Sequence, residues 1–167
     1  MFGGSITKSK VEKCYIHNWY NNTGILLSGS SNNIITENDI GPAGSGTYSG
    51  VWINSSSNNV VSANNFQSCP QGGVWLYATE KNTITGNNIQ SSTGGAYGHG
   101  INFEGYGTNN TITGNVISSS EAHGIYLNDS SNYNTISSNT LKNNSQSADN
   151  TYSDIFLDTN SSYNVIE

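Results

Sequence analysis

The sequence has little positive charge: it contains no Arg and only five Lys, against eleven Asp and Glu, which gives a formal net charge of −6. Proteins that bind nucleic acids neutralise phosphates with clustered Lys and Arg, so we expect no nucleic-acid partner. Long apolar runs are missing as well. Because a membrane-spanning helix needs ~20 predominantly apolar residues, we also expect no insertion into a membrane.

Apolar residues are scarce, at 33% of the chain, and charged residues make up only 10%. A low apolar content can indicate disorder, but disordered chains are usually rich in charge and poor in aromatic residues. Here aromatic residues reach 10%, and the apolar residues recur at regular positions. We therefore predict a folded protein whose core is built from these regularly spaced apolar residues.

Asn, Ser, Thr and Gly take the place of the missing residues, and they are arranged in a repeat. The phrase NNTITGNVI at 109–117 recurs in similar form at 32–40, 58–66, 81–89 and 133–141. The first aligned Asn column consists of Asn33, Asn59, Asn82, Asn110, Asn134 and Asn164. The second consists of Asn38, Asn64, Asn87, Asn115 and Asn139. The aliphatic column between them consists of Ile35, Val61, Ile84, Ile112, Ile136 and Ile166.

Each unit also contains a third apolar phrase, represented by GVWI at 50–53 and GIYL at 124–127. The three segments of a unit have apolar residues at every second position, which predicts short β-strands rather than helices. Units of 20–30 residues with strands too short for stable hairpins favour a solenoid. We therefore expect an all-β parallel β-helix in which each turn lies ~4.8 Å from the one before.

The Asn columns have an architectural interpretation. Stacked Asn side chains can hydrogen-bond to the turns above and below, and Asn tolerates the left-handed backbone of tight turns. The segment SKVEKCYI at 9–16 fits the pattern as a degenerate turn, with Cys14 as a small, buried replacement for the second Asn. Cys69 falls two turns later, ~10 Å away, which exceeds the ~7 Å Cα limit for a disulfide. We predict two free thiols.

The phrases NNTITGNVI and GIYLNDSSNYNTI resemble the right-handed parallel β-helix repeats of the pectate-lyase-like superfamily, and most closely the NosD-type repeats. The resemblance covers nearly the whole chain. It implies a single-stranded right-handed solenoid of six to seven rungs, with residues 1–167 as one domain that could be a fragment of a longer β-helix. The superfamily includes lyases, hydrolases, epimerases, phage tailspikes and surface proteins. Function must therefore come from the site.

The strand that begins with the third phrase is flanked by the loops that vary most in length, where such a solenoid would build a site. Its outward positions predict a row formed by Leu26, Trp52, Trp75, Asn102, Tyr126 and Phe156. The next outward row is Ser28, Asn54, Tyr77, Glu104, Asn128 and Asp158. Aromatic faces stack on sugar rings, so we select as glycan-binding candidates Trp52, Trp75, Tyr77, Tyr126 and Asp158. Coverage of these rings by loops or by a partner chain is the alternative.

His99 and His123 occupy the same position on adjacent turns, so their backbones should lie ~4.8 Å apart. Together with Glu104 they form our catalytic candidates, because two His and a carboxylate can serve as acid and base or hold a divalent metal. The alternative is two exposed imidazoles at loop ends. No cofactor is required, and a divalent metal remains compatible with this cluster.

The phrase HGI is similar to one in mannuronan C5-epimerases, but the Asp-Pro-His motif of those enzymes is absent. Pectate-lyase-like sites combine an acidic Ca²⁺-binding cluster with Arg or Lys, and no Lys aligns with the His pair. Glu104 and Asp158 would lie two rungs apart, ~10 Å, which is wider than the ~6.5–9.5 Å of an inverting hydrolase. No catalytic residue is carried over from these families.

We expect an extracellular or cell-surface β-helix that binds polysaccharide along its aromatic sheet face. Sequons such as the one at Asn109 favour secretion weakly. The alternatives are a polysaccharide lyase or uronate epimerase with a site near His99 and His123, a structural or adhesive spacer, or an ice-binding face formed by the outward Thr residues at 83, 111 and 135. Self-association through the solenoid ends or the aromatic stripe is a further expectation.

Overall fold

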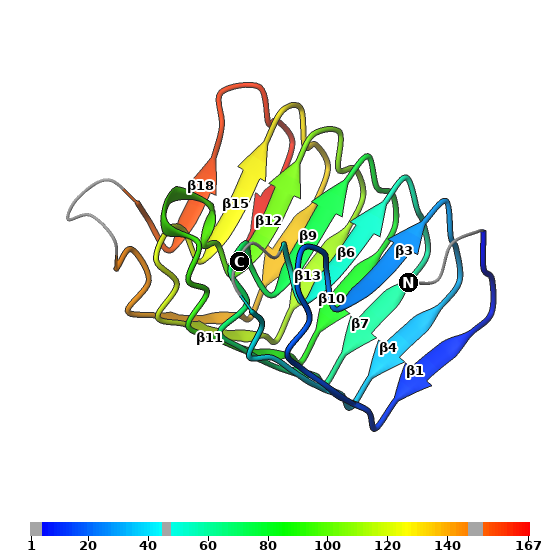
Figure 1. Cartoon of the computed structure of the whole chain (residues 1–167). Coiled ribbons are helices and arrows are strands. Elements are labelled where there is room, and N and C mark those ends of the chain that lie inside the picture. The colour runs from blue at the N-terminus through cyan, green and yellow to red at the C-terminus, as the bar shows by residue number, and fades with distance from the viewer. Residues whose placement is uncertain (1–4, 45–47, 147–151) are drawn as a thin grey trace.

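The computed structural model describes residues 5–44, 48–146 and 152–167. The chain winds as a coil of short strands, so that strands from successive turns lie side by side in parallel sheets (Figure 1). The all-β parallel solenoid with three strands per turn is confirmed. In the described part of the chain, no helix is long and apolar enough to cross a membrane.

The strands form three sheets, which we call the first, second and third sheet. The first contains β1 (Lys10–Glu12), β4 (Ile34–Thr36), β7 (Val60–Ser62), β10 (Thr83–Thr85), β13 (Thr111–Thr113), β16 (Thr135–Ser137) and β19 (Val165–Ile166). The second contains β2 (Tyr15–Ile16), β5 (Asp39–Ile40), β8 (Asn65–Gln67), β11 (Asn88–Gln90), β14 (Val116–Ser118) and β17 (Thr140–Lys142). The third contains β3 (Ile25–Ser28), β6 (Val51–Asn54), β9 (Val74–Tyr77), β12 (Ile101–Glu104), β15 (Ile125–Asn128) and β18 (Ile155–Leu157).

The number of turns is slightly lower than predicted. Among the described residues, the second and third sheets hold six strands each, which are separated by five steps along the axis, so the coil makes about five turns instead of six to seven rungs. The sequence count included the incomplete turns at both ends of the repeat, where the strands are short. β2 and β19, for example, contain only two residues each.

The core lies inside the coil and consists of one inward side chain from each strand of the first and second sheets and two from most strands of the third. Ile84 and Ile89 on one turn are 0% exposed, as are Ile112 and Ile117 on the next. In register, Ile84 pairs with Val61 and with Ile112. The aliphatic columns of the repeat are therefore the stacked core columns.

A Gly before the third-sheet strand allows the chain to bend tightly against the neighbouring turn. A Cβ atom on Gly100 would lie 2.3 Å from Cγ2 of Ile117 and 2.6 Å from the carbonyl oxygen of Gly124. Both distances are well below van der Waals contact, so any side chain here would push the core and the next turn apart.

The two predicted Asn ladders are present. In the second ladder, Oδ1 of Asn115 accepts hydrogen bonds from the backbone N–H and from Nδ2 of Asn87, both at 3.0 Å. Nδ2 of Asn87 also donates to the carbonyl oxygen of Val61 at 2.9 Å. The ladder side chains in the middle of the coil are almost completely buried. Each one therefore satisfies backbone groups that the turn would otherwise leave unpaired.

The left-handed backbone conformation belongs to a different residue from the one expected. The residue immediately before the ladder Asn has the positive φ, for example 55° at Lys81, 57° at Tyr133 and 55° at Glu37. These residue types show that the turn does not depend on Asn for its backbone geometry. The ladder position needs Asn for its side-chain hydrogen bonds instead.

Both cysteines are free thiols, as predicted. Cys14 occupies the second ladder position, where its backbone N–H donates to Oδ1 of Asn38 at 3.0 Å. The expected burial of Cys14 is wrong: it is exposed, whereas Cys69 is buried. Because β2 is the edge strand at the N-terminal end of the second sheet, Cys14 has a described neighbouring turn on one side only.

Candidate functional site

The outward face of the third sheet carries the predicted rows of side chains in register. Trp52 pairs with Trp75, and Asn102 pairs with Trp75 on one side and Tyr126 on the other. Phe156 then pairs with Tyr126. The row is therefore two groups of aromatic residues separated by Asn102, not one continuous stripe.

The first aromatic group lies on β6 and β9. The rings of Trp52 and Trp75 stack with centroids 5.4 Å apart, and Tyr48 from the preceding loop lies 5.9 Å and 6.0 Å from them. A loop side chain thus covers part of both indoles, which are half-buried. Tyr48 and Tyr77, at 39% and 42% exposure, provide the open aromatic surface of this group.

The second aromatic group surrounds the two histidines. Tyr126 lies 4.7 Å from the ring centroid of His99 and 5.2 Å from that of His123. Phe156 stacks on His123 at 4.7 Å, and Tyr152 meets the same ring edge-on at 5.1 Å. Aromatic side chains therefore surround His123 on several sides.

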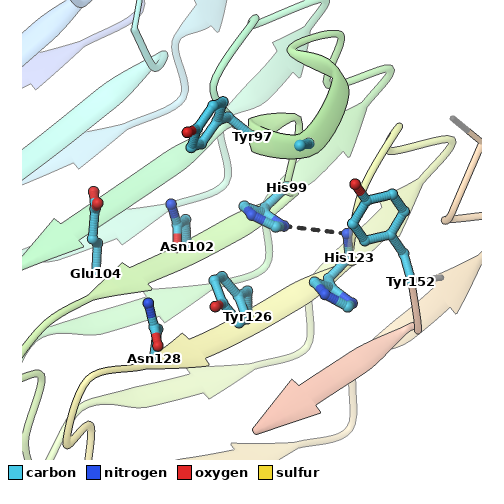
Figure 2. A pocket seen from close by; sticks show the side chains of 9 residues that line it. Tyr97, His99, Asn102, Glu104, His123, Tyr126, Asn128 and Tyr152 are labelled. Atoms are coloured by element: carbon cyan, nitrogen blue, oxygen red, sulfur yellow. Dashed lines mark hydrogen bonds between the residues drawn. The ribbon is translucent and has the colours of Figure 1, made fainter. Parts of the chain in front are cut away.

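His99 and His123 are buried, at 3% and 6% exposure, so the alternative of two exposed imidazoles is wrong. Their rings are nearly parallel, with centroids 5.3 Å apart. Nδ1 of His99 accepts a hydrogen bond from the backbone N–H of His123 at 3.2 Å (Figure 2). Nδ1 of His123 accepts one from Ser153 at 2.9 Å. The two imidazoles thus form a short ladder, in which the following turn donates its backbone N–H, opposite to the direction of the Asn ladders.

Burial holds both imidazoles in the neutral form. Burial and, to a smaller extent, the neighbouring His123 together lower the pKa of His99 to about 3. Burial also lowers the pKa of His123. Because Nδ1 accepts a hydrogen bond in each ring, the single proton of the neutral ring resides on Nε2. Each histidine therefore offers a donor at Nε2.

A half-open pocket of about 210 Å³ lies next to this pair. It is lined by Ala96, Tyr97, His99, Asn102, Glu104, His123, Tyr126, Asn128 and Tyr152 (Figure 2). Its volume is smaller than the ~300–1,000 Å³ of pockets that enclose whole drug-sized ligands. The pocket suits a single ring of a larger ligand.

One wall of the pocket is formed by the loop before β12, which contains the short 3₁₀ helix η1 (Gly95–Tyr97). A carboxylate oxygen of Glu121, on the next turn, accepts a hydrogen bond from the backbone N–H of Gly95 at 2.6 Å. Glu121 thereby fixes the loop that carries Tyr97.

Glu104 and Asn102 form the floor of the pocket on β12. The pKa of Glu104 is raised by burial and by the negative charge of Asp129, while the Trp75 indole has the opposite effect. Asn102 is only 5% exposed, and its Oδ1 has no hydrogen-bond partner among the residues that the structure describes.

The structure brings together four of the predicted site residues, His99, His123, Glu104 and Tyr126. Three others, Trp52, Trp75 and Tyr77, lie on the same sheet but outside the pocket, and Asp158 lies outside it directly after β18. Asp158 accepts a hydrogen bond from the backbone N–H of Thr159 at 2.7 Å, which stabilises the turn after β18. Within residues 5–44, 48–146 and 152–167, no three His, Cys, Asp or Glu side chains are placed to hold a metal ion.

Sequence reasoning did not select Asn102, Asn128, Tyr97 and Tyr152 as site residues. The register of the repeat already placed Asn102 and Asn128 in the outward rows beside Glu104, so their position was a usable signal. Tyr97 and Tyr152 come from loops that differ in length between the repeats, so the repeat does not predict the course of these loops.

Two solved structures share this fold. The periplasmic alginate epimerase AlgG superposes with a TM-score of 0.69 at 19% identity, over 95% of this chain and 39% of that one. The A-module of the Azotobacter vinelandii mannuronan C-5 epimerase AlgE4 superposes with a TM-score of 0.63 at 14% identity, over 98% of this chain and 59% of that one. This chain therefore spans less than two thirds of either protein.

No curated protein matches the sequence. The family model described as "Right handed beta helix region" matches residues 3–167, which is nearly the entire chain. The narrower assignment to NosD-type repeats stays a prediction. The matched range, the parallel solenoid and the two similar structures together lead to one conclusion: the chain belongs to the right-handed β-helix family.

Proposed function

We propose that this protein binds polysaccharide along the outward face of the third sheet, with the His99–His123 pocket as one sugar-binding subsite. One observation carries the proposal: an aromatic and polar pocket sized for one ring lies on the same face as a second aromatic group. Sugar-binding sites combine aromatic faces, which stack on the apolar sides of sugar rings, with a few placed polar groups.

The arrangement suits a ligand that runs across the strands. A chain lying along the solenoid axis would pass Tyr77 on β9, the pocket on β12 and β15, and Phe156 on β18. Successive strands lie ~4.8 Å apart, so these contacts extend over three strand steps, ~14 Å. Several sugar units could therefore contact the face at once, whereas the pocket itself takes one.

The comparisons support a polysaccharide-related role and a location outside the cytoplasm. Both similar structures are named as epimerases, of alginate in one and of mannuronan in the other, and the first is described as periplasmic. At 19% and 14% identity these proteins share the fold, and the ligand and location of this chain are our inference. We place the protein at the cell surface or in another extracytoplasmic compartment.

A glycan array followed by affinity electrophoresis tests the proposal. Tyr77→Ala and Trp75→Ala should each weaken binding about threefold to tenfold, because each removes an aromatic contact. Tyr15→Ala is the matched control, since Tyr15 is 66% exposed on the second sheet, away from the proposed face. Failure of the wild type to bind any glycan would refute the proposal and favour the hypothesis of a structural or adhesive spacer. Equal binding by all three variants would show that the binding site does not lie on the third sheet.

Catalysis in the pocket is the second candidate function. It is favoured by the meeting of His99, His123, Glu104 and Tyr126, because groups that move protons are needed for a lyase or an epimerase. Incubation with oligouronates, followed by NMR for changed C5 configuration or unsaturated ends, tests it. Turnover that is lost in Tyr126→Phe and in His123→Ala would support an enzyme. Binding without turnover would support a binding protein.

A further inference from the structure

The charge around the pocket restricts its ligand further than its shape does. Glu104 lines the pocket, and Asp129 is close enough to raise its pKa. The pKa of Tyr126 is raised by burial and then by the charges of Asp158, Asp129 and Glu104. Three carboxylates thus act on one edge of the pocket.

Positive charge is missing from the same region. The sequence has no Arg, and none of its five Lys is among the described residues that line the pocket. The two histidines do not supply a cation near neutral pH, because burial lowers the pKa of both. An anionic sugar would therefore face negative charge in a partly desolvated pocket without a compensating cation, which is unfavourable.

The buried side chain of Asn102 independently indicates that the ligand carries a hydrogen-bond donor. This side chain is almost completely buried, and among the described residues its Oδ1 accepts no hydrogen bond. A buried acceptor without a partner carries an energetic cost that a bound donor would remove. Figure 2 shows Asn102 between Glu104 and His99 on the side of the pocket formed by β12. In this view the amide nitrogen of Asn102 lies at the outer end of the side chain and the buried Oδ1 points toward the strand, so Oδ1 faces the space beside Glu104 only after the amide turns over.

Aromatic faces complete the site. Tyr97, Tyr126 and Tyr152 line the pocket around these acceptors. The faces of aromatic rings carry partial negative charge and attract cations, more strongly where water is excluded. An ammonium group has three donors and no acceptor, which matches the Glu104 carboxylate and the aromatic faces, whereas the Nε2 donors of His99 and His123 match hydroxyl oxygens of the same ring.

We propose that the pocket binds the amine-bearing ring of an amino-sugar polymer, in preference to a uronate. This inference rests on the proposed polysaccharide-binding function and names its substrate class. The protonated amine pairs with the Glu104 carboxylate, and, with the Asn102 amide turned over, a neighbouring hydroxyl of the same ring donates to its Oδ1. The two acceptors are two residues apart on one face of β12, ~7 Å along the strand, so one sugar ring reaches both.

Isothermal titration calorimetry of the full chain tests the proposal with three oligosaccharides of equal length: oligoglucosamine, its fully N-acetylated form and an oligogalacturonate. The wild type should bind the amine form at least about tenfold more tightly than either of the others. Glu104→Gln should weaken binding of the amine form about tenfold to a hundredfold, because a charge-assisted hydrogen bond is lost.

Glu37→Gln is the matched control, since it removes the same charge from an exposed residue between the first and second sheets. Its affinity for the amine form should stay within about twofold of the wild type, because exposed charges at a distance are screened. Asn102→Leu should lower affinity several-fold without lowering the melting temperature, since it removes an acceptor that has no partner.

Each other outcome has a clear meaning. Preferred binding of the N-acetylated form or of the galacturonate would overturn the amino-sugar assignment and leave polysaccharide binding intact. Equal losses in Glu104→Gln and Glu37→Gln would show general charge attraction, and would also overturn it. Absence of binding by all three oligosaccharides, together with an empty glycan array, would remove both proposals.

Discussion

The histidine ladder should make the protein sensitive to mild acid, and His99→Asn should reduce that sensitivity. Nδ1 of His99 accepts the backbone N–H of His123, which is the role that Oδ1 has in the Asn ladders. Asn can therefore replace the hydrogen bond of His99 without a group that titrates in this range. The substitution separates the structural role of the side chain from its charge.

The direction of the effect follows from the pKa of His99, which is lowered from 6.5 to about 3 by burial and by His123. The unfolded chain thus binds a proton at a higher pH than the folded protein does. The stability that depends on neutral His99 is fully present above a pH of about 6.5, and it is lost as the pH falls toward about 3. His123, whose pKa is also lowered by burial, contributes with the same sign.

The expected magnitude is measurable. Between about pH 8 and about pH 5, proton uptake by the unfolded chain at His99 costs about 2 kcal/mol of unfolding free energy. Glu104 opposes this change, because burial raises its pKa and the folded protein then binds a proton more readily. The difference between wild type and His99→Asn removes the Glu104 contribution, since both proteins contain it.

Urea unfolding at a series of pH values, followed by tryptophan fluorescence and by circular dichroism, measures the effect. His99→Asn should be less stable than the wild type at pH 8, because the ring contacts with Tyr126 are lost, but its stability should fall less on acidification. His17→Asn, at an exposed histidine, is the control and should follow the wild type. Parallel pH curves for wild type and His99→Asn would refute the buried neutral ladder.

Two further predictions concern the ladders and the thiols. Asn87→Ala should lower the unfolding free energy by about 3 kcal/mol, because it leaves buried backbone and side-chain groups of the adjacent turns unpaired. Asn164→Ala, at a half-exposed ladder position, should lower it by about 1 kcal/mol. Equal melting temperatures would contradict this order. A thiol reagent should label exposed Cys14 at once and Cys69 only after unfolding, since burial raises the pKa of Cys69 to about 12. Rapid labelling of two thiols in the native protein would contradict the burial of Cys69.

The fold could be predicted because each turn repeats the same physical requirements. Ile84 and Ile112 occupy equivalent positions, and so do Asn87 and Asn115, so alignment of the repeats is already an alignment of neighbouring strands. The same alignment placed His99 beside His123. Period-2 apolar residues and recurrent side-chain acceptors are local signals that survive without any knowledge of tertiary structure.

The candidate site was only partly predictable, because it depends on what differs between turns. Burial of His123 results from packing against Phe156 and Tyr152, and Tyr152 belongs to a loop whose length differs between the repeats. The residue with positive φ was also misassigned, since Lys81 and Tyr133 give no compositional sign of a left-handed turn. The periodic pattern of apolar residues does not predict how the loops pack or which residue of a turn has the positive φ.

The Asn ladders also give the solenoid a direction. In each described ladder bond that ends on an Asn side-chain oxygen, the turn nearer the N-terminus supplies the donor and the following turn supplies the oxygen, as from the backbone N–H of Ser9 to Asn33 and from that of Cys14 to Asn38. In these ladders a turn that only donates can carry any residue with a backbone N–H, whereas a turn that accepts must carry Asn; the histidine pair has the opposite direction, because His99 accepts from the following turn. The two faces of each turn are therefore chemically unlike, so turns can be joined only head to tail, and substitutions such as Cys14 are tolerated on the donating side alone.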